Sequence, residues 1–206
     1  MLDREALRLV AITDSLRDGV EGLASRASAA VRGGATMIQL RLPDESPRVL
    51  VAAARALRQA APDVPLVVND RADVALAAGA DGVHVGGDGL SIAALRRILP
   101  ARFVVGVSVG DDDEIAGARG ADYVAIGPLF ASSSATTATG IGVERFRALA
   151  AGCGVPVLAV GGLSPENAAS VLAAGAAGVA AISALLGAAD PMAAARAFRG
   201  SAASGR

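Results

Sequence analysis

The sequence predicts a single-domain α/β fold in which eight strand–helix units close into a compact (β/α)8 barrel. Apolar, β-rich runs alternate with helical segments eight times along 206 residues, which is typical of a parallel sheet covered by helices. Gly-Ala pairs that begin at residues 34, 79, 120 and 175 each precede an expected strand, which indicates one βα unit used repeatedly. Aromatic residues make up only 2% of the chain, so Ala, Val, Leu and Ile must fill the core. Such a core suits a sheet that Ala-rich helices cover on both faces.

An open, doubly wound sheet is the alternative fold. Gly-rich turns follow several of the expected strands rather than only the first, which disfavours a dinucleotide-binding sheet of that type. We expect residues 1–200 to form the barrel and residues 201–206 to be a disordered tail.

The strands are expected from short apolar runs that end at glycine or polar residues. In chain order they lie at residues 9–13, 37–40, 66–68, 82–85, 103–107, 123–126, 155–160 and 178–182.

The helices are expected from apolar positions at three- and four-residue spacing and from their caps. Ser46 and Pro47, for example, are typical of an N-cap and a first helical position. The expected helices span residues 19–32, 47–61, 72–78, 91–99, 111–118, 143–151, a segment that begins at Pro165, and 191–198, and a long polar loop covers 127–142.

Composition excludes several classes of function. All 19 basic residues are Arg, so a Schiff-base aldolase, a pyridoxal phosphate enzyme and a Walker P-loop, which require lysine, are excluded. The net charge of −1 gives no basic field for nucleic acid. The single cysteine, Cys153, excludes a disulfide framework and a cysteine-based metal cluster. No charge-free apolar run approaches 18 residues and the N-terminus is acidic, so we expect a cytoplasmic protein that does not enter a membrane.

Polar residues cluster where the expected strands end. In a barrel these ends meet at one mouth, where function resides. Arg41 suits bidentate binding of a diphosphate, and Asp70 is the best candidate ligand for Mg2+, which takes one or two carboxylates together with phosphate oxygens. The strand-end residues are Asp14, Gln39, Arg41, Asn69, Asp70, Asp88, Ser108, Ser132, Ser133, Ser134 and Ser183.

The segment 155–185 carries the predicted phosphate site. Gly161 and Gly162 follow one apolar run, and Ser183 follows the next, at the expected mouth of a further helix. Backbone N–H groups at glycine turns and helix starts bind anions without a charged side chain. The alternative is that the two glycines only form a tight turn.

The only histidine, His84, alternates with Val83 and Val85 and therefore points to the other face of its strand. No Ser, Cys or Asp accompanies it at triad spacing, so we expect a hydrogen-bonded core or barrel-lumen histidine rather than a catalytic base.

Six segments cover nearly the whole chain and together form a recognisable set: VAITD, MIQLR, LVVNDRADVALAAGADGVHVG, VGVSV, GADYVAIGPLF and VPVLAVGGLSPENAASVLAAGAAGVAAISALL. In order and spacing this set resembles the thiamine phosphate synthase/TenI family. The resemblance implies a compact TIM barrel and a transferase with Mg2+ as cofactor. Such an enzyme joins hydroxymethylpyrimidine diphosphate to thiazole phosphate, giving thiamine phosphate and diphosphate. In this family the diphosphate leaves first, and the thiazole nitrogen attacks the resulting pyrimidine carbocation.

The resemblance also implies roles for individual residues. The catalytic residues would be Arg41, Asn69 and Ser108, and Mg2+ would be bound by Asp70 and by Asp88, which stands one residue before the family's second metal aspartate. The pyrimidine and thiazole substrates would be held by Gln39, Arg41, Asn69, Ser108, Ser132, Ser133, Ser134, Gly162, Ile182 and Ser183.

Three positions depart from the synthase pattern. Pro43 and Ala135 stand where the family has lysine, and Gly89 stands at the second metal aspartate. TenI-type isomerases have a proton-transfer histidine where this chain has Val109 and Gly110. The alternatives are a TenI-like isomerase, a binding paralogue without turnover, or a barrel isomerase or lyase of another phosphorylated metabolite. The expected partners are the small phosphorylated pyrimidine and thiazole substrates, without nucleic acid or membrane, and with a homodimer as an option.

Overall fold

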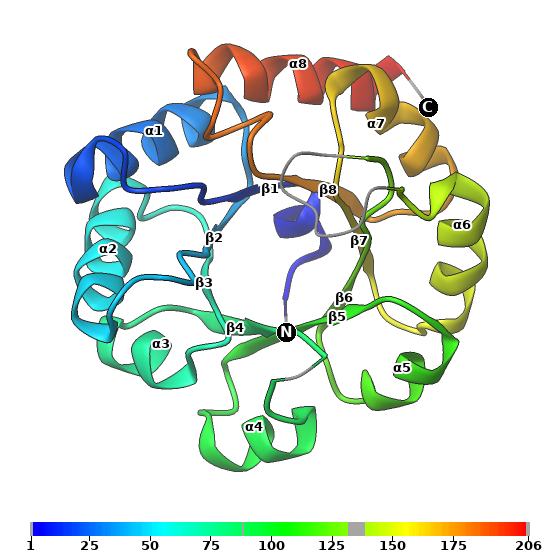
Figure 1. The fold of residues 1–206 in the computed structure, drawn as a ribbon, viewed down its shortest axis with the longest axis horizontal. Coiled ribbons are helices and arrows are strands. Elements are labelled where there is room, and N and C mark those ends of the chain that lie inside the picture. Colours follow the sequence, from blue (N-terminus) through cyan, green and yellow to red (C-terminus); the bar gives the residue numbers. More distant parts are fainter. Residues whose placement is uncertain (1, 88, 132–138, 205–206) are drawn as a thin grey trace.

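The structure, a computed structural model, describes residues 2–87, 89–131 and 139–204. Within these ranges the strands form a closed parallel barrel surrounded by helices (Figure 1). The strands are β1 (Leu9–Ile12), β2 (Met37–Leu40), β3 (Leu66–Asn69), β4 (Gly82–Val85), β5 (Val104–Val109), β6 (Tyr123–Ile126), β7 (Val157–Val160) and β8 (Gly178–Ala181). The helices are η1 (Arg4–Leu7), α1 (Gly19–Gly33), α2 (Pro47–Ala60), α3 (Ala72–Ala78), α4 (Ile92–Ile98), α5 (Asp112–Gly117), α6 (Gly142–Gly152), α7 (Pro165–Ala173) and α8 (Pro191–Ser204).

Pairing between the first and last strands closes the sheet. Leu9 lies opposite Val179 and Val10 opposite Ala180, in the same parallel sense as the other neighbours. The predicted (β/α)8 barrel is therefore confirmed, and the open-sheet alternative is wrong.

The core has two layers, because residues on each strand alternate between the lumen and the helices. The outer layer packs the sheet against the Ala-rich helices. The inner layer fills the lumen with Leu7, Val10, Met37, Tyr123 and Leu158, among others. Leu7 comes from η1, a short 3-10 helix near the N-terminus that the sequence did not predict and that lies against the barrel interior (Figure 1).

The repeated Gly-Ala turns have the expected geometry. Gly34, Gly79, Gly120 and Gly175 all have positive φ angles, of 114°, 68°, 87° and 105°. A side chain would be strained in this left-handed conformation, which explains why each turn before a strand begins with glycine.

Several expected boundaries differ from the structure, mostly by one or two residues, and two of the differences affect the site or the end of the chain. Strand β5 continues to Val109, so Ser108 lies within the strand rather than after it. Helix α8 continues to Ser204, four residues beyond the expected end of the barrel, since the Ala-rich sequence favours helix and the Ser201 hydroxyl donates to the Ala197 carbonyl (3.2 Å). Residues 205 and 206 of the expected tail lie outside the described residues. No helix in the described ranges is both long and apolar enough to cross a membrane.

Candidate functional site

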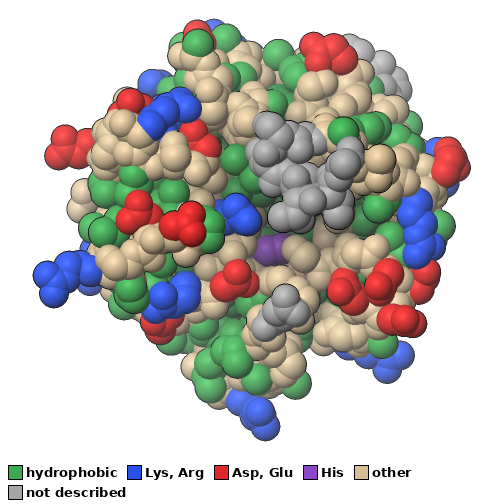
Figure 2. Space-filling model, in the orientation of Figure 1, with side chains coloured by type: hydrophobic (Ala, Val, Ile, Leu, Met, Phe, Trp, Pro, Cys, Tyr) green, Lys and Arg blue, Asp and Glu red, His purple; other side chains and the backbone are tan. Residues whose placement is uncertain are grey.

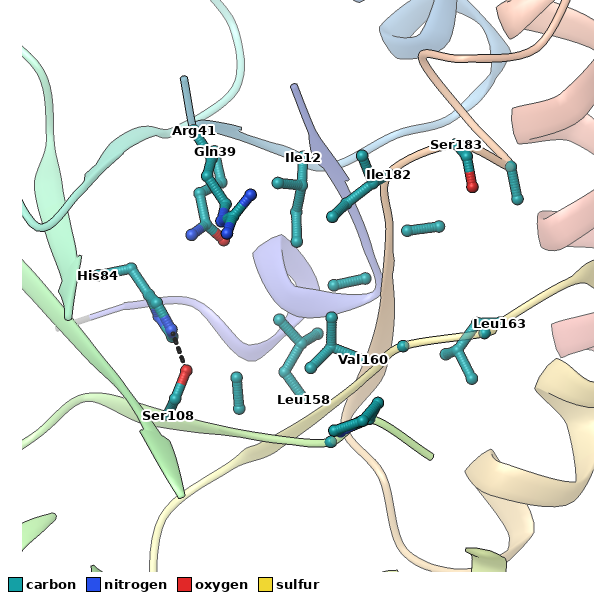
Figure 3. Close-up of a pocket in the computed structure, with 18 of the residues that line it drawn as sticks. Ile12, Gln39, Arg41, His84, Ser108, Leu158, Val160, Leu163, Ile182 and Ser183 are labelled. Carbon is teal, nitrogen blue, oxygen red and sulfur yellow. Dashed lines mark hydrogen bonds between the residues drawn. The ribbon is translucent and has the colours of Figure 1, made fainter. Parts of the chain in front are cut away.

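The carboxyl ends of the strands surround a cavity of about 430 Å3, a size typical of small-molecule sites (Figure 3). In the space-filling view the mouth is a hollow, and the only histidine of the chain is visible inside it (Figure 2). Its floor is apolar and includes Ile12, Ala125, Leu158 and Ala180. Of the predicted site residues, those that line the cavity are Gln39, Arg41, Asn69, Ser108, Gly162, Ile182 and Ser183.

Arg41 is fixed through its backbone. The buried Thr13 hydroxyl accepts from the Arg41 N–H (2.8 Å) and donates to the Arg41 carbonyl (2.9 Å). The guanidinium makes no ion pair with any residue in the described ranges, and it lies beside the Gln39 side chain at the cavity (Figure 3). A cation held this way is available to an anionic ligand.

A chain of hydrogen bonds joins the ends of β2, β3 and β4. Gln39 Nε2 donates to Asn69 Oδ1 (3.0 Å), and Asn69 Nδ2 donates to Asp70 Oδ2 (2.6 Å). The other carboxylate oxygen of Asp70 accepts from the Gly86 N–H (3.1 Å). The amide orientations of Gln39 and Asn69 are thereby set, and the Asp70 carboxylate is directed to the turn after β4.

Asp70 is the only non-glycine residue with positive φ in the described part of the chain, at 58°. Such a conformation costs on the order of 1 kcal/mol and is often found at functional sites. Asp70 does not itself line the cavity. Among the described residues, no three His, Cys, Asp or Glu side chains gather as a metal site, and the second expected ligand, Asp88, lies outside those residues.

Ser108, which is partly buried, belongs with the buried His84 and Tyr123 to a polar group that spans three strands. Its hydroxyl lies 3.0 Å from His84 Nε2 (Figure 3), and His84 Nδ1 lies 3.0 Å from the Tyr123 hydroxyl. Burial lowers the pKa of His84 to about 4 and raises the pKa of Tyr123, so both are neutral at pH 7. The predicted hydrogen-bonded lumen histidine is confirmed, although sequence reasoning missed that it also lines the cavity.

Tyr123 was not predicted to support the site. A Cβ built on Gly106, the residue of β5 that lies opposite it, would be 2.2 Å from the ring carbon Cζ of Tyr123. The glycine therefore leaves the space that the tyrosine ring occupies, a signal that is visible in the sequence only once the register of the strands is known.

The turns after β7 and β8 form the opposite side of the cavity. Gly162 has a φ of 66°, and a Cβ there would lie 2.5 Å from the Phe130 carbonyl oxygen, so only glycine fits. After β8 the Ile182 carbonyl accepts from the N–H groups of Leu185 (3.1 Å) and Leu186 (3.0 Å). Ser183 thus begins a single turn, and the expectation of a helix at this point is wrong, because α8 starts at Pro191.

Backbone N–H groups at these turns are available to a ligand. No hydrogen bond joins the N–H groups of Gly162, Ser183 or Ala184 to another residue in the ranges that the structure describes. Amides at a glycine turn and at the start of a helical turn favour an anion.

Some predicted residues do not reach the cavity or are not described. Asp14 forms ion pairs with Arg26 (3.0 Å) and Arg17 (3.0 Å) and does not line the cavity. Ser132, Ser133 and Ser134 lie outside the described residues, as does Ala135. The base of their loop is anchored beside the cavity, since the N–H groups of Leu129 and Phe130 donate to the carbonyls of Val160 and Gly161.

Comparison with known proteins agrees with this geometry. The family model described as thiamine monophosphate synthase matches residues 9–185. The chain belongs to the thiamine monophosphate synthase family. The thiamine-phosphate synthase of Roseiflexus sp. (strain RS-1) is 47% identical over 91% of this chain and 81% of that protein. The thiamine-phosphate synthase of Methanoregula boonei is 44% identical over 94% of this chain and 92% of that protein. The solved structure of thiamine phosphate pyrophosphorylase from Pyrococcus furiosus is 36% identical, covers 98% of both chains and has a TM-score of 0.86.

Proposed function

We propose that this member of the thiamine monophosphate synthase family is a transferase that joins hydroxymethylpyrimidine diphosphate to thiazole phosphate, giving thiamine phosphate and diphosphate. The observation that carries the proposal is the convergence on one cavity of oriented amides with an arginine and backbone N–H groups that have no partner among the described residues. Relatives that are named thiamine-phosphate synthase support it at 44% and 47% identity.

The side of the cavity formed by β2, β3 and β5 suits the pyrimidine substrate. Next to this side, Ile12 and Leu158 of the floor offer apolar surface for a flat ring. The buried Gln39 amide on β2 and the Ser108 hydroxyl on β5 offer polar contacts at its edge. The Arg41 guanidinium, free of an ion pair among the described residues, suits the diphosphate through paired charge-assisted hydrogen bonds.

The opposite side suits the thiazole phosphate. The N–H groups of Gly162, Ser183 and Ala184, without partners in the described chain, supply donors for a monophosphate. Since backbone atoms make these contacts, Ser183→Ala should change the affinity for thiazole phosphate by about threefold or less. Gly162→Ala should weaken it by at least about tenfold, because the added Cβ would meet the Phe130 carbonyl. Isothermal titration calorimetry measures both, and equal losses for the two variants would contradict a backbone site.

In the proposed reaction the bond between the pyrimidine methylene carbon and the diphosphate oxygen breaks, and its electron pair leaves with the diphosphate. The thiazole nitrogen then donates its lone pair to that carbon and forms the new C–N bond. The chain holds the two substrates in line and stabilises the departing negative charge through Arg41. No protein nucleophile is needed, which agrees with a site that presents no lysine or cysteine.

One residue at the rim of the cavity, Asp70, suits the binding of Mg2+. Asp70 is held at the rim in a strained conformation by Asn69 and Gly86, and each carboxylate oxygen has a further lone pair for a cation. Mg2+ commonly takes only one or two carboxylates besides phosphate oxygens and water. When bound by Asp70 and substrate oxygens, Mg2+ would neutralise charge on the diphosphate.

The test is formation of thiamine phosphate by the purified chain with both substrates and Mg2+. We expect product only when both substrates are present. Absence of product, while a control synthase forms it under the same conditions, would refute the proposal.

A binding paralogue without turnover is the second candidate, and Pro43 and Gly89, in place of a cation and a carboxylate, favour it. Calorimetry separates the two candidates. A paralogue of this kind would bind thiazole phosphate and would gain no affinity for the pyrimidine diphosphate from Mg2+, whereas the proposed transferase would gain it.

A further inference from the structure

We infer that Tyr123 is a positioning residue that sets the hydrogen-bond direction of Ser108 through His84. In this arrangement the Tyr123 hydroxyl donates to His84 Nδ1, and the His84 Nε2–H donates to Ser108 Oγ. The Ser108 proton is then left for an acceptor atom of the ligand. The role in substrate selection rests on the proposed function, whereas the tautomer of His84 does not.

The direction of the two hydrogen bonds follows from the Tyr123 hydroxyl, which has a single possible partner among the described residues. Tyr123 is fully buried, and His84 Nδ1, 3.0 Å away, is the only hydrogen-bond partner of its hydroxyl among the described residues. A phenol carries one proton to donate, and a buried donor without an acceptor carries a desolvation penalty. Donation to Nδ1 removes that penalty and requires Nδ1 to be unprotonated.

The opposite tautomer leaves the tyrosine unsatisfied. If Nδ1 carried the proton, the Tyr123 oxygen would accept it, and the Tyr123 proton would have no described acceptor. With the proton on Nε2, the bond to Ser108 Oγ at 3.0 Å is also made. Ser108 is only partly buried and lines the cavity, so its own proton reaches water or a ligand.

The charged form of the His84 ring is disfavoured as well. An imidazolium would donate from both nitrogens, so the Tyr123 proton would again have no acceptor. The groups that face His84 are Tyr123 on β6, Ser108 on β5 and the carboxylate of Asp70 beyond β3. Asp70 alone favours the charged ring, and burial outweighs it, so the pKa of His84 falls to about 4.

The consequence is a rule for the ligand. The Ser108 proton points to the ligand, so the best partner for it is a hydrogen-bond acceptor, such as a ring nitrogen or an ether or phosphate oxygen. A ligand N–H at this point could use only the second lone pair of the Ser108 oxygen, and it would leave the Ser108 proton without a partner on the ligand. Tyr123 therefore contributes to selectivity for an acceptor-bearing heterocycle without touching it.

The tautomer can be read directly, because the chain has one histidine. Long-range 1H–15N correlation spectra of the ligand-free protein at pH 7, labelled with 15N-histidine, give the protonation of both ring nitrogens. We expect a neutral ring protonated at Nε2, with a Nδ1 resonance that Tyr123→Phe moves toward that of a nitrogen without a hydrogen-bond donor. A ring protonated at Nδ1 in the wild-type protein would overturn the inference.

A double-mutant cycle tests the coupling to the ligand. Calorimetry with hydroxymethylpyrimidine diphosphate should show losses of about 2- to 10-fold for Tyr123→Phe and for Ser108→Ala, the range for one hydrogen bond. The double variant should bind about as well as Ser108→Ala alone, because Tyr123 acts through Ser108. Losses that multiply would overturn the positioning role. If the wild-type protein does not bind this substrate, the proposed function fails while the spectra still decide the tautomer.

Discussion

Replacement of His84 by glutamine should remove a specific pH dependence from the stability of the protein. His84 is buried and held as the neutral ring, so its pKa falls from the ordinary 6.5 to about 4 in the folded protein. Between these values the unfolded chain binds more protons than the folded one. The contribution of the neutral His84 ring to the free energy of unfolding is therefore fully present above pH 6.5 and is lost as the pH falls toward 4.

The magnitude follows from the two pKa values. At pH 5 the histidine of the unfolded chain is almost fully protonated, and that of the folded protein is about one-tenth protonated. Lowering the pH from 7 to 5 should thus cost the wild-type protein about 2 kcal/mol through His84 alone. The full difference of about 3 kcal/mol would be reached only below pH 4.

Urea unfolding at pH 5 and pH 7 measures this effect in both proteins. The two proteins differ only at residue 84, so the comparison isolates the effect of removing the histidine. We expect the wild-type protein to lose about 2 kcal/mol more than the variant. Equal losses would refute the conclusion that burial keeps His84 neutral.

Two further substitutions, each with a control substitution, test the packing around Tyr123 and the charge at the site. Gly106→Ala should lower the unfolding free energy by at least about 1–3 kcal/mol, because the new Cβ would lie 2.2 Å from the Tyr123 ring. Gly117→Ala, with nothing within 4 Å of the added Cβ, should be neutral or slightly stabilising in the same urea titration, and equal effects would contradict this packing. Arg41→Ala should weaken binding of the pyrimidine diphosphate by about 10- to 100-fold in calorimetry, the range for a lost hydrogen bond to a charged group. Arg119→Ala, which removes an exposed arginine from the turn before β6, should change that affinity by no more than about twofold, and similar losses for the two variants would show that Arg41 contributes only net charge.

The sequence predicted the barrel and much of its mouth because both depend on local patterns. Apolar runs and glycine caps mark each βα unit, and a barrel brings the residues that follow each run to one rim. Gln39, Arg41 and Asn69 could thus be assigned to one site although no local contact joins them. Their roles in catalysis remain predictions.

Other features depend on distances across the barrel. The contact between His84 and Tyr123 joins residues 39 positions apart on strands that are not neighbours, and it requires the space left by Gly106. The direction of the Asp70 carboxylate depends on its positive φ and on the Gly86 N–H, neither of which has a sequence signature. Helix η1 has only four residues, too few for a periodic pattern to identify.

The product balance of the reaction decides whether this protein joins the two substrates. Purified protein is given hydroxymethylpyrimidine diphosphate, thiazole phosphate and Mg2+, and thiamine phosphate and released diphosphate are quantified in the same samples. We expect the two products to form in equal amounts and both to be strongly reduced in Arg41→Ala. Release of neither product by the wild-type protein, or diphosphate release without thiamine phosphate, would contradict it.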